Sequence, residues 1–256
     1  MFFDIKHRLL PDTEPFCQGA QDEDMAECMA FEAYQQGCRF IMATPSDSAI
    51  QNALEDPDSE GIPSGIAKKY HSLSRRIRRS MPDLILGLGC EIRCSRGNVE
   101  EIIYHLNKGH YPTMNHTPYI LVSFAEDVPR GDLWFCLEQL HRAGYMPILS
   151  HAQNIRTLRY DIHEIQCLKG NAERGPDYRF KALIQLDTLS LHPTESNHWS
   201  WEMIRSGVVD MLATNAKNSF SHPPHIQEEL AALDRVCSPD YLKAITWGNA
   251  AKRFLP

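Results

Sequence analysis

The stretch FFDIKHRLLP, residues 2–11, begins with an apolar, β-prone run and then turns abruptly charged. A buried parallel strand is typical of such a run. Strands of α/β barrels carry their chemistry at their carboxyl ends, where alternate side chains point the same way. The alternate residues here are Lys6 and Arg8, both cations, and His7 is expected on the opposite face. The stretch therefore predicts the first strand of a parallel α/β fold that delivers two cations to its active end.

Similar apolar runs recur along the chain and alternate with helical patterns. Strands are expected over residues 2–6, 38–43, 84–92, 119–124, 146–150, 182–186 and 208–213. Helices are expected over residues 22–36, 66–80, 131–143, 155–169, 199–206, 225–236 and 239–245. Seven strands that alternate with helices indicate a parallel sheet covered on both faces. Because 256 residues match the length of one barrel, the chain is interpreted as a single domain over residues 1–256.

Composition excludes several classes of protein. The net charge of −7 argues against nucleic-acid binding, which usually depends on excess Lys and Arg. No apolar run approaches the roughly 20 residues that cross a bilayer, and charges interrupt the N-terminus where a signal peptide would be apolar. Eight scattered cysteines form no C-x-x-C motif, which is typical of buried thiols in a reducing compartment. A cytoplasmic location is expected.

Six short motifs at the predicted strand ends follow one another in a specific order. They are Asp4-Ile5-x-x-x-Leu9-Leu10-Pro11, Ala43-Thr44-Pro45, Gly89-Cys90-Glu91-Ile92-Arg93, Tyr119-Ile120-Leu121-Val122-x-Phe124, Pro147-Ile148-Leu149-Ser150-His151 and Ala213-Thr214-Asn215-Ala216-Lys217-Asn218. This order resembles the bacterial protein tyrosine phosphatases of the PHP (polymerase and histidinol phosphatase) superfamily, which occur with capsule and exopolysaccharide synthesis systems. The resemblance implies a distorted, TIM-like (β/α)7 barrel with a trinuclear centre of manganese or a similar divalent ion. Such a centre activates a bridging water and clamps phosphate oxygens.

The chain departs from the family pattern at most of the implied metal ligands. Of eight ligand positions, only Glu91 and His151 keep ligand residues. The six replaced positions are Lys6, Arg8, Ser46, Ser123, Asn215 and Lys217. The resemblance assigns histidines to the first three, a glutamate to the fourth, and an aspartate and a histidine to the last two. The two arginines that grip phosphate in the family correspond to Asn154 and His222.

These replacements predict a homologue without phosphatase activity and without a bound cofactor, which acts as a binding or regulatory protein. In one interpretation, Lys6, Arg8 and Lys217 pair with Asp4, Glu91 and neighbouring acids and only replace the lost metal charge. In a second, Lys6, Arg8, Arg93 and Lys217 form an anion pocket at a cationic barrel mouth. By resemblance, the expected partner is a tyrosine-phosphorylated kinase tail or another polysaccharide-assembly protein.

Two catalytic alternatives stay open. A reduced metal site on Glu91 and His151 would preserve a phosphatase or related hydrolase. Metal-free chemistry on Lys6 or Lys217 would need a lysine whose pKa is lowered by burial or by neighbouring cations.

A basic run lies outside these motifs, over residues 68–79. Its apolar stripe is intact, so the pattern predicts an outer helix whose cationic face is solvated. Docking on an acidic partner or on a membrane surface is the alternative.

Overall fold

The computed structural model describes residues 1–170, 180–192 and 197–255. Within these ranges there are eight strands: β1 (Phe2–His7), β2 (Cys38–Ala43), β3 (Ile85–Leu88), β4 (Glu91–Arg93), β5 (Tyr119–Ser123), β6 (Met146–Leu149), β7 (Leu183–Asp187) and β8 (Met211–Ala213). The α-helices of the same ranges are α1 (Glu23–Gln35), α2 (Asp47–Asn52), α3 (Ser64–Ser80), α4 (Val99–Asn107), α5 (Arg130–Arg142), α6 (Ile162–Leu168), α7 (His198–Arg205), α8 (Gln227–Asp234), α9 (Pro239–Lys243) and α10 (Asn249–Phe254).

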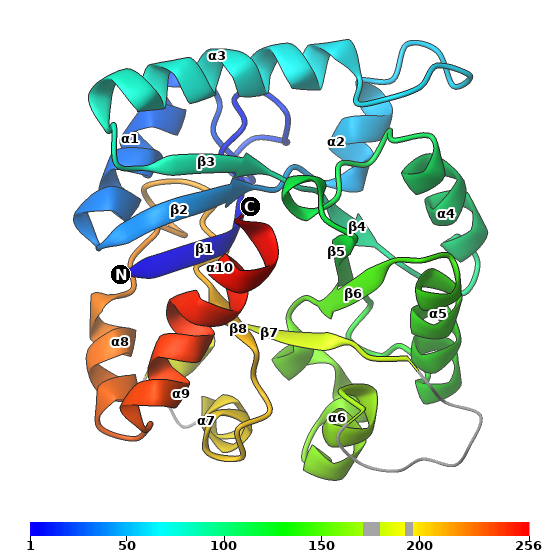
Figure 1. The fold of residues 1–256 in the computed structure, drawn as a ribbon, viewed down its shortest axis with the longest axis vertical. Helices are drawn as coiled ribbons and strands as arrows, with labels where there is room; N and C mark the ends of the chain where they lie inside the picture. The colour runs from blue at the N-terminus through cyan, green and yellow to red at the C-terminus, as the bar shows by residue number, and fades with distance from the viewer. Residues whose placement is uncertain (171–179, 193–196, 256) are drawn as a thin grey trace.

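The strands form two parallel sheets that meet at both edges. One sheet has the order β1-β2-β3 and the other the order β4-β5-β6-β7-β8. Single parallel bridges join them, His7 with Ala216 on one side and Ser46 with Glu91 on the other. Most helices lie outside the strands, whereas α10 lies beside β1 (Figure 1). The predicted parallel α/β architecture is confirmed, as two sheets that single bridges connect.

The segment predicted as one strand over residues 84–92 is two strands. β3 pairs with β2, whereas β4 pairs with β5, so the chain passes from one sheet to the other at Gly89-Cys90. A Cβ atom on Gly89 would lie 2.6 Å from the Met114 sulfur, so a larger residue would require the Met114 side chain to shift. If β3 and β4 are counted as one bent strand, the described strands number seven, as predicted.

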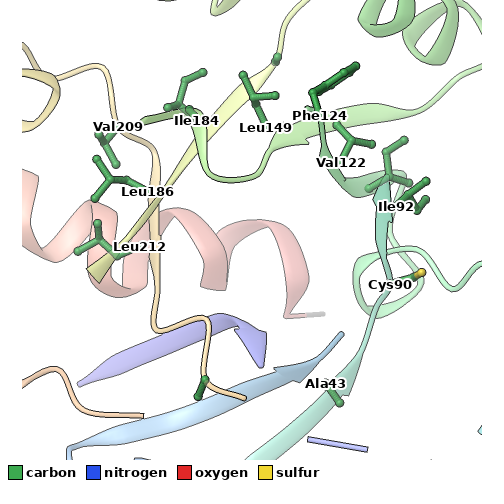
Figure 2. Close-up of a cluster of buried hydrophobic side chains, with 14 of the residues drawn as sticks. Ala43, Cys90, Ile92, Val122, Phe124, Leu149, Ile184, Leu186, Val209 and Leu212 are labelled. Carbon is green, nitrogen blue, oxygen red and sulfur yellow. The ribbon is translucent and has the colours of Figure 1, made fainter. Parts of the chain in front are cut away.

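Apolar side chains fill both faces of the strands. Inside the ring, Phe3, Phe40, Leu121 and Ile148 pack with Phe254 of α10. Between the strands and the helices lies a larger cluster, part of which Figure 2 shows on successive strands. Burial on both faces explains why the strands read as nearly continuous apolar runs. The interior is therefore packed at one end, which leaves the opposite end for polar residues.

Some predicted boundaries were wrong. The helix expected over residues 155–169 is α6 alone, preceded by two 3-10 turns, because Asp161 caps the new helix by accepting from the Glu164 N–H. The strand expected over 208–213 begins only at Met211. Three helices were not predicted: α2, α4 and α10. The shortest, such as α2, span too few turns to show a 3.6-residue period. In the described ranges, no helix combines the length and apolarity needed to cross a membrane.

Candidate ligand-binding site

A cavity of about 860 Å³ opens at the carboxyl ends of the strands. All eleven residues singled out from the sequence line it: Lys6, Arg8, Ser46, Glu91, Arg93, Ser123, His151, Asn154, Asn215, Lys217 and His222. Two of them, His151 and Asn215, follow strand ends with positive φ angles of 53° and 54°. Left-handed backbone in non-glycine residues is strained and clusters at functional sites. The volume lies in the range of ordinary ligand pockets.

Lys6 lies at the floor of this cavity, and its side chain is 1% exposed. A bulge in β1 between Asp4 and His7 includes this position, because Asp4 pairs with Ile41 while His7 pairs with Ala43. The extra residue re-aims the strand end. The Lys6 ammonium donates to Glu91 Oε1 at 2.7 Å, to Ser150 Oγ at 3.2 Å and to His151 Nε2. One lysine therefore occupies the space between the two remaining ligand-type residues.

Arg8 holds the second oxygen of the same carboxylate. Its guanidinium donates to Glu91 Oε2 and, from its other terminal nitrogen, to Glu14 Oε1 at 2.9 Å. Glu14 also accepts the backbone N–H of Ser46 at 2.6 Å and the Ser46 hydroxyl at 2.9 Å. Glu91 is thus bound by a cation on each oxygen, and Glu14 connects the arginine to the end of β2.

His151 continues this network on the far side of Lys6. Its Nδ1 lies against Asp187 Oδ2, while its Nε2 contacts the Lys6 ammonium, which donates a hydrogen bond to it. A neutral imidazole with the hydrogen on Nδ1 satisfies both contacts, since Nε2 must then accept. Gln185 Oε1 accepts the His151 backbone N–H at 3.0 Å and the Ser150 hydroxyl at 3.1 Å. The chain of contacts from Glu91 to Asp187 fixes both the tautomer and the orientation of the ring.

Burial and charge shift the pKa values of this network in definite directions. Burial alone would raise the pKa of the Glu91 carboxyl, but Lys6 and Arg8 hold it well below its usual range. The pKa of Asp187 is lowered in the same way, because His151 and Lys6 outweigh the effect of burial. Burial lowers the pKa of Lys6, while Glu91 and Asp187 oppose that shift. The two carboxylates are therefore ionised at neutral pH.

The cavity as a whole is not cationic. Four cations line it, and five carboxylates face them: Glu14, Asp47, Glu91, Glu126 and Asp187. The prediction of a cationic mouth was wrong because it omitted four of these acids, which lie in loops, at the start of α2 or at the end of β7, outside the motifs. Asp4 was also wrongly expected to pair with the cations, since its carboxylate contacts His7 and Thr214 instead.

Two of the cations that line the cavity are not neutralised by an ion pair with a described carboxylate. Lys217 donates to Gln18 Oε1 at 3.0 Å, and the Arg93 backbone N–H donates to Asp47 Oδ2 at 2.9 Å. Among the described residues, neither the Lys217 ammonium nor the Arg93 guanidinium forms an ion pair with a carboxylate. The buried Asn215 Oδ1 finds no hydrogen-bond partner within the same ranges. His7 does not line the cavity, as predicted from its position in the strand. Arg93 is the last residue of β4, and Lys217 lies in the segment that follows β8.

Two residues that complete the network were missed in the sequence. Asp187 ends β7, so the same strand-end rule that selected His151 could have found it. Glu14 lies in the loop after β1, where nothing in its neighbourhood distinguishes it from a surface acid. Only the fold of that loop over the strand ends brings Glu14 to Arg8.

The residues present do not fit the metal centre that the resemblance implies. A metal on Glu91 and His151 needs the lone pairs that Lys6 and Arg8 already use. In the described ranges, no group of three or more His, Cys, Asp or Glu side chains is arranged to hold a metal ion. A cation at the centre would also repel a divalent ion across a few ångströms.

Two exposed aromatic side chains lie on loops whose other residues line this site. Phe16 is 81% exposed and Phe220 is 89% exposed. Their loops are tied together where Asn218 Nδ2 donates to the Cys17 carbonyl oxygen at 3.0 Å. Solvent-exposed aromatic residues beside a ligand cavity are typical of surfaces that contact other molecules.

The strand order and the polar cavity at the carboxyl ends define a barrel of the PHP type. The chain belongs to the family described as capsular polysaccharide synthesis, CpsB/CapC, whose model matches residues 2–255. It is 28% identical over 239 residues to the tyrosine-protein phosphatase YwqE of Bacillus subtilis. The alignment covers 91% of this chain and 84% of YwqE. It is 21% identical over 239 residues to the tyrosine-protein phosphatase CpsB of Streptococcus pneumoniae. This alignment covers 88% of this chain and 86% of CpsB.

Solved structures agree with this assignment. Crystal structures of YwqE and CpsB, described as unique metal-dependent tyrosine phosphatases, include a chain that matches with a TM-score of 0.78 and 25% identity. The match covers 98% of this chain and 94% of the solved one. The resemblance stated from the sequence motifs is confirmed at the level of family and fold.

Proposed function

We propose that this chain is a non-catalytic member of the tyrosine-phosphatase family of capsule synthesis, which binds a phosphorylated partner without hydrolysing it. The observation that carries the proposal is the position of the Lys6 ammonium, bound to Glu91, Ser150 and His151. A lysine there supplies a fixed positive charge but no Lewis-acidic site and no activated water. The relatives' phosphatase activity depends, by their description, on metal.

The ligand proposed for the cavity is a phosphate monoester, and the family context favours phosphotyrosine on a kinase tail or on another polysaccharide-assembly protein in the cytoplasm. Arg93 and Lys217 supply the open charges, because the charges of Lys6 and Arg8 are already balanced. Ser46, Ser123, Asn154 and His222 add hydrogen-bonding groups around the same space. A charge-assisted hydrogen bond to phosphate is about twice as strong as a neutral one.

The exposed aromatic pair supports a macromolecular ligand. Phe16 and Phe220 lie on two loops that line the cavity and that the Asn218–Cys17 contact holds together. Aromatic side chains of this exposure dominate binding energy at protein interfaces. A phosphorylated segment that enters the cavity would cover both rings, whereas a free phosphate ion would cover neither.

The proposal is tested by three measurements on the purified chain. Metal content is determined after incubation with manganese, zinc and iron and removal of free ions; hydrolysis of para-nitrophenyl phosphate is followed with each metal; and phosphotyrosine peptide is titrated by calorimetry. The expected result is negligible metal, no hydrolysis, and binding of the phosphopeptide but not of its unphosphorylated form. Stoichiometric metal with hydrolysis would instead establish the alternative, a reduced metal site on Glu91 and His151. No metal and no phosphopeptide binding would reject both.

A further inference from the structure

The helix α3 (Ser64–Ser80) carries a concentration of positive charge that the cavity does not use. Between residues 61 and 82 there are six Lys and Arg residues and no Asp or Glu, in a chain whose net charge is −7. The helix runs along the outer edge of the molecule, outside β3 (Figure 1). The helix therefore has a positive electrostatic potential, whereas the chain as a whole is negatively charged.

Two of the six cations serve the fold. Lys69 contacts Asp12 Oδ2 at 3.1 Å, and Arg76 is held by Glu23, Asp24 and Glu27 of α1. These pairs attach α3 to the neighbouring loop and helix. They account for two cations on the inner edge of the helix and leave the outer ones unexplained.

The other four cations form an exposed stripe, defined here by Lys68, Arg75, Arg78 and Arg79. Within the described residues, none of the four has a carboxylate partner. Arg78 and Arg79 lie in the last turn, where they interact favourably with the helix dipole. Lys68 lies in the second turn and Arg75 in the middle, so the dipole explains neither. Like charges spaced three or four residues apart destabilise a helix.

The shape of the surface indicates the kind of partner. The nearest groove, about 330 Å³ between α1 and α3, is lined by Asp24 and Glu27 as well as by Arg76. An acidic peptide in that groove would meet two carboxylates. The stripe itself lies on the convex outer face of a straight helix, where a flat anionic surface can contact every cation at once. Phe31 borders the same groove as Arg76 and is 51% exposed, which places an exposed aromatic ring at the edge of this basic helix.

We propose that the α3 stripe docks the protein on an anionic lipid bilayer, with Phe31 at the headgroup level. Cations near an anionic surface and an aromatic side chain beside them are the features of peripheral membrane association. Each Lys or Arg near such a surface strengthens partitioning by about fivefold. Binding is reversible and weakens with salt, because four charges and one ring do not anchor a chain permanently. This docking does not depend on the function proposed for the cavity.

The test is co-sedimentation with vesicles of equal parts phosphatidylglycerol and phosphatidylcholine, and with vesicles of phosphatidylcholine alone. We expect binding only to the anionic vesicles at low ionic strength, and loss of roughly tenfold or more in the variant Lys68→Gln/Arg75→Gln/Arg79→Gln. The matched control, Arg235→Gln/Lys243→Gln/Lys252→Gln, removes the same charge from exposed positions elsewhere and leaves binding unchanged. Circular dichroism checks that both variants are folded.

Several outcomes would overturn the inference. Equal loss in both triple variants would mean that net charge, and not the stripe, decides binding. Absence of binding to the anionic vesicles at low salt would reject membrane docking directly. If the stripe variant lost binding to poly-glutamate while vesicles never bound the parent chain, the partner would be an acidic polypeptide instead.

Discussion

The Lys6 ammonium lies 2.7 Å from Glu91 Oε1 and joins the first strand of one sheet to the first strand of the other. Both side chains are buried, with exposed fractions of 1% and 8%. The contact places a tethered cation between a carboxylate and an imidazole, a position otherwise suited to a divalent ion.

Removal of Lys6 creates a metal site. The variant Lys6→Ala frees Glu91 Oε1 and His151 Nε2, and Asp187 still orients the imidazole through Nδ1. We expect the variant to bind a divalent ion more tightly than the parent chain does, because a carboxylate and a neutral imidazole both suit zinc and manganese. Metal analysis, and the rise in melting temperature on adding zinc, measure the change.

The matched control is Lys217→Ala, which removes a cation from the same cavity without touching Glu91 or His151. It should bind no more metal than the parent chain. Equal metal in the two variants, or none in Lys6→Ala, would contradict this account of the site.

Loss of Lys6 also destabilises the fold. Removing one partner of a buried ion pair costs about 3–5 kcal/mol, because the other charge stays buried. We expect Lys6→Met to lower the free energy of unfolding by roughly the lower end of that range, since Arg8 still contacts Glu91. Urea denaturation gives the value.

A double-mutant cycle separates the pair from its surroundings. Lys6→Met/Glu91→Gln should be more stable than the sum of the single variants predicts, by about 0.5–3 kcal/mol. Simple additivity would show that the two side chains are not energetically coupled.

Acid weakens the protein through Glu91 and Asp187. The pKa values of both carboxyls are lowered by folding, so the native state binds fewer protons than the unfolded chain. Their stabilisation is complete above the unfolded values of about 4.3 and 3.9, and it is lost as the pH falls through the lower native values. The urea concentration at the unfolding midpoint should therefore decrease as the pH is lowered from about 5 in the parent chain. The same decrease should be less steep in Glu91→Gln.

The control for this prediction is Asp47→Asn. Burial raises the pKa of the Asp47 carboxyl, so its contribution to the pH dependence has the opposite sign. The acid loss should persist in this variant. If the urea midpoint of Glu91→Gln depended on pH as steeply as that of the parent chain, Glu91 would not contribute to the acid sensitivity.

Open cations decide phosphate affinity. Arg93→Ala and Lys217→Ala each remove one charge that has no carboxylate partner in the described ranges, and each should weaken phosphopeptide binding about tenfold. Calorimetry at several salt concentrations measures both the affinity and its salt dependence. Arg96→Ala is the control, because Arg96 lies three residues from Arg93, outside the cavity lining, and pairs with Asp132 at 3.1 Å. An equal loss in Arg96→Ala would indicate a general charge effect.

Much of the fold was predictable because apolar periodicity reports burial along each segment. β2 was predicted with its observed bounds, and Gly37 follows α1 in the left-handed conformation expected of a helix stop. The break between β3 and β4 was not predictable, since an apolar run looks the same whether it stays in one sheet or crosses to another. The change of sheet depends on which neighbours each half meets.

The sequence by itself determined that cations replace two ligand positions at the end of the first strand, and which other strand ends would meet them. Strand alternation and motif order carry that information locally. Only the tertiary structure decided that Lys6 binds Glu91, 85 residues away, and that Glu14 and Asp187 balance the charge. Such pairings depend on strand register and on loops folding over the barrel end, and no periodicity within a segment encodes either.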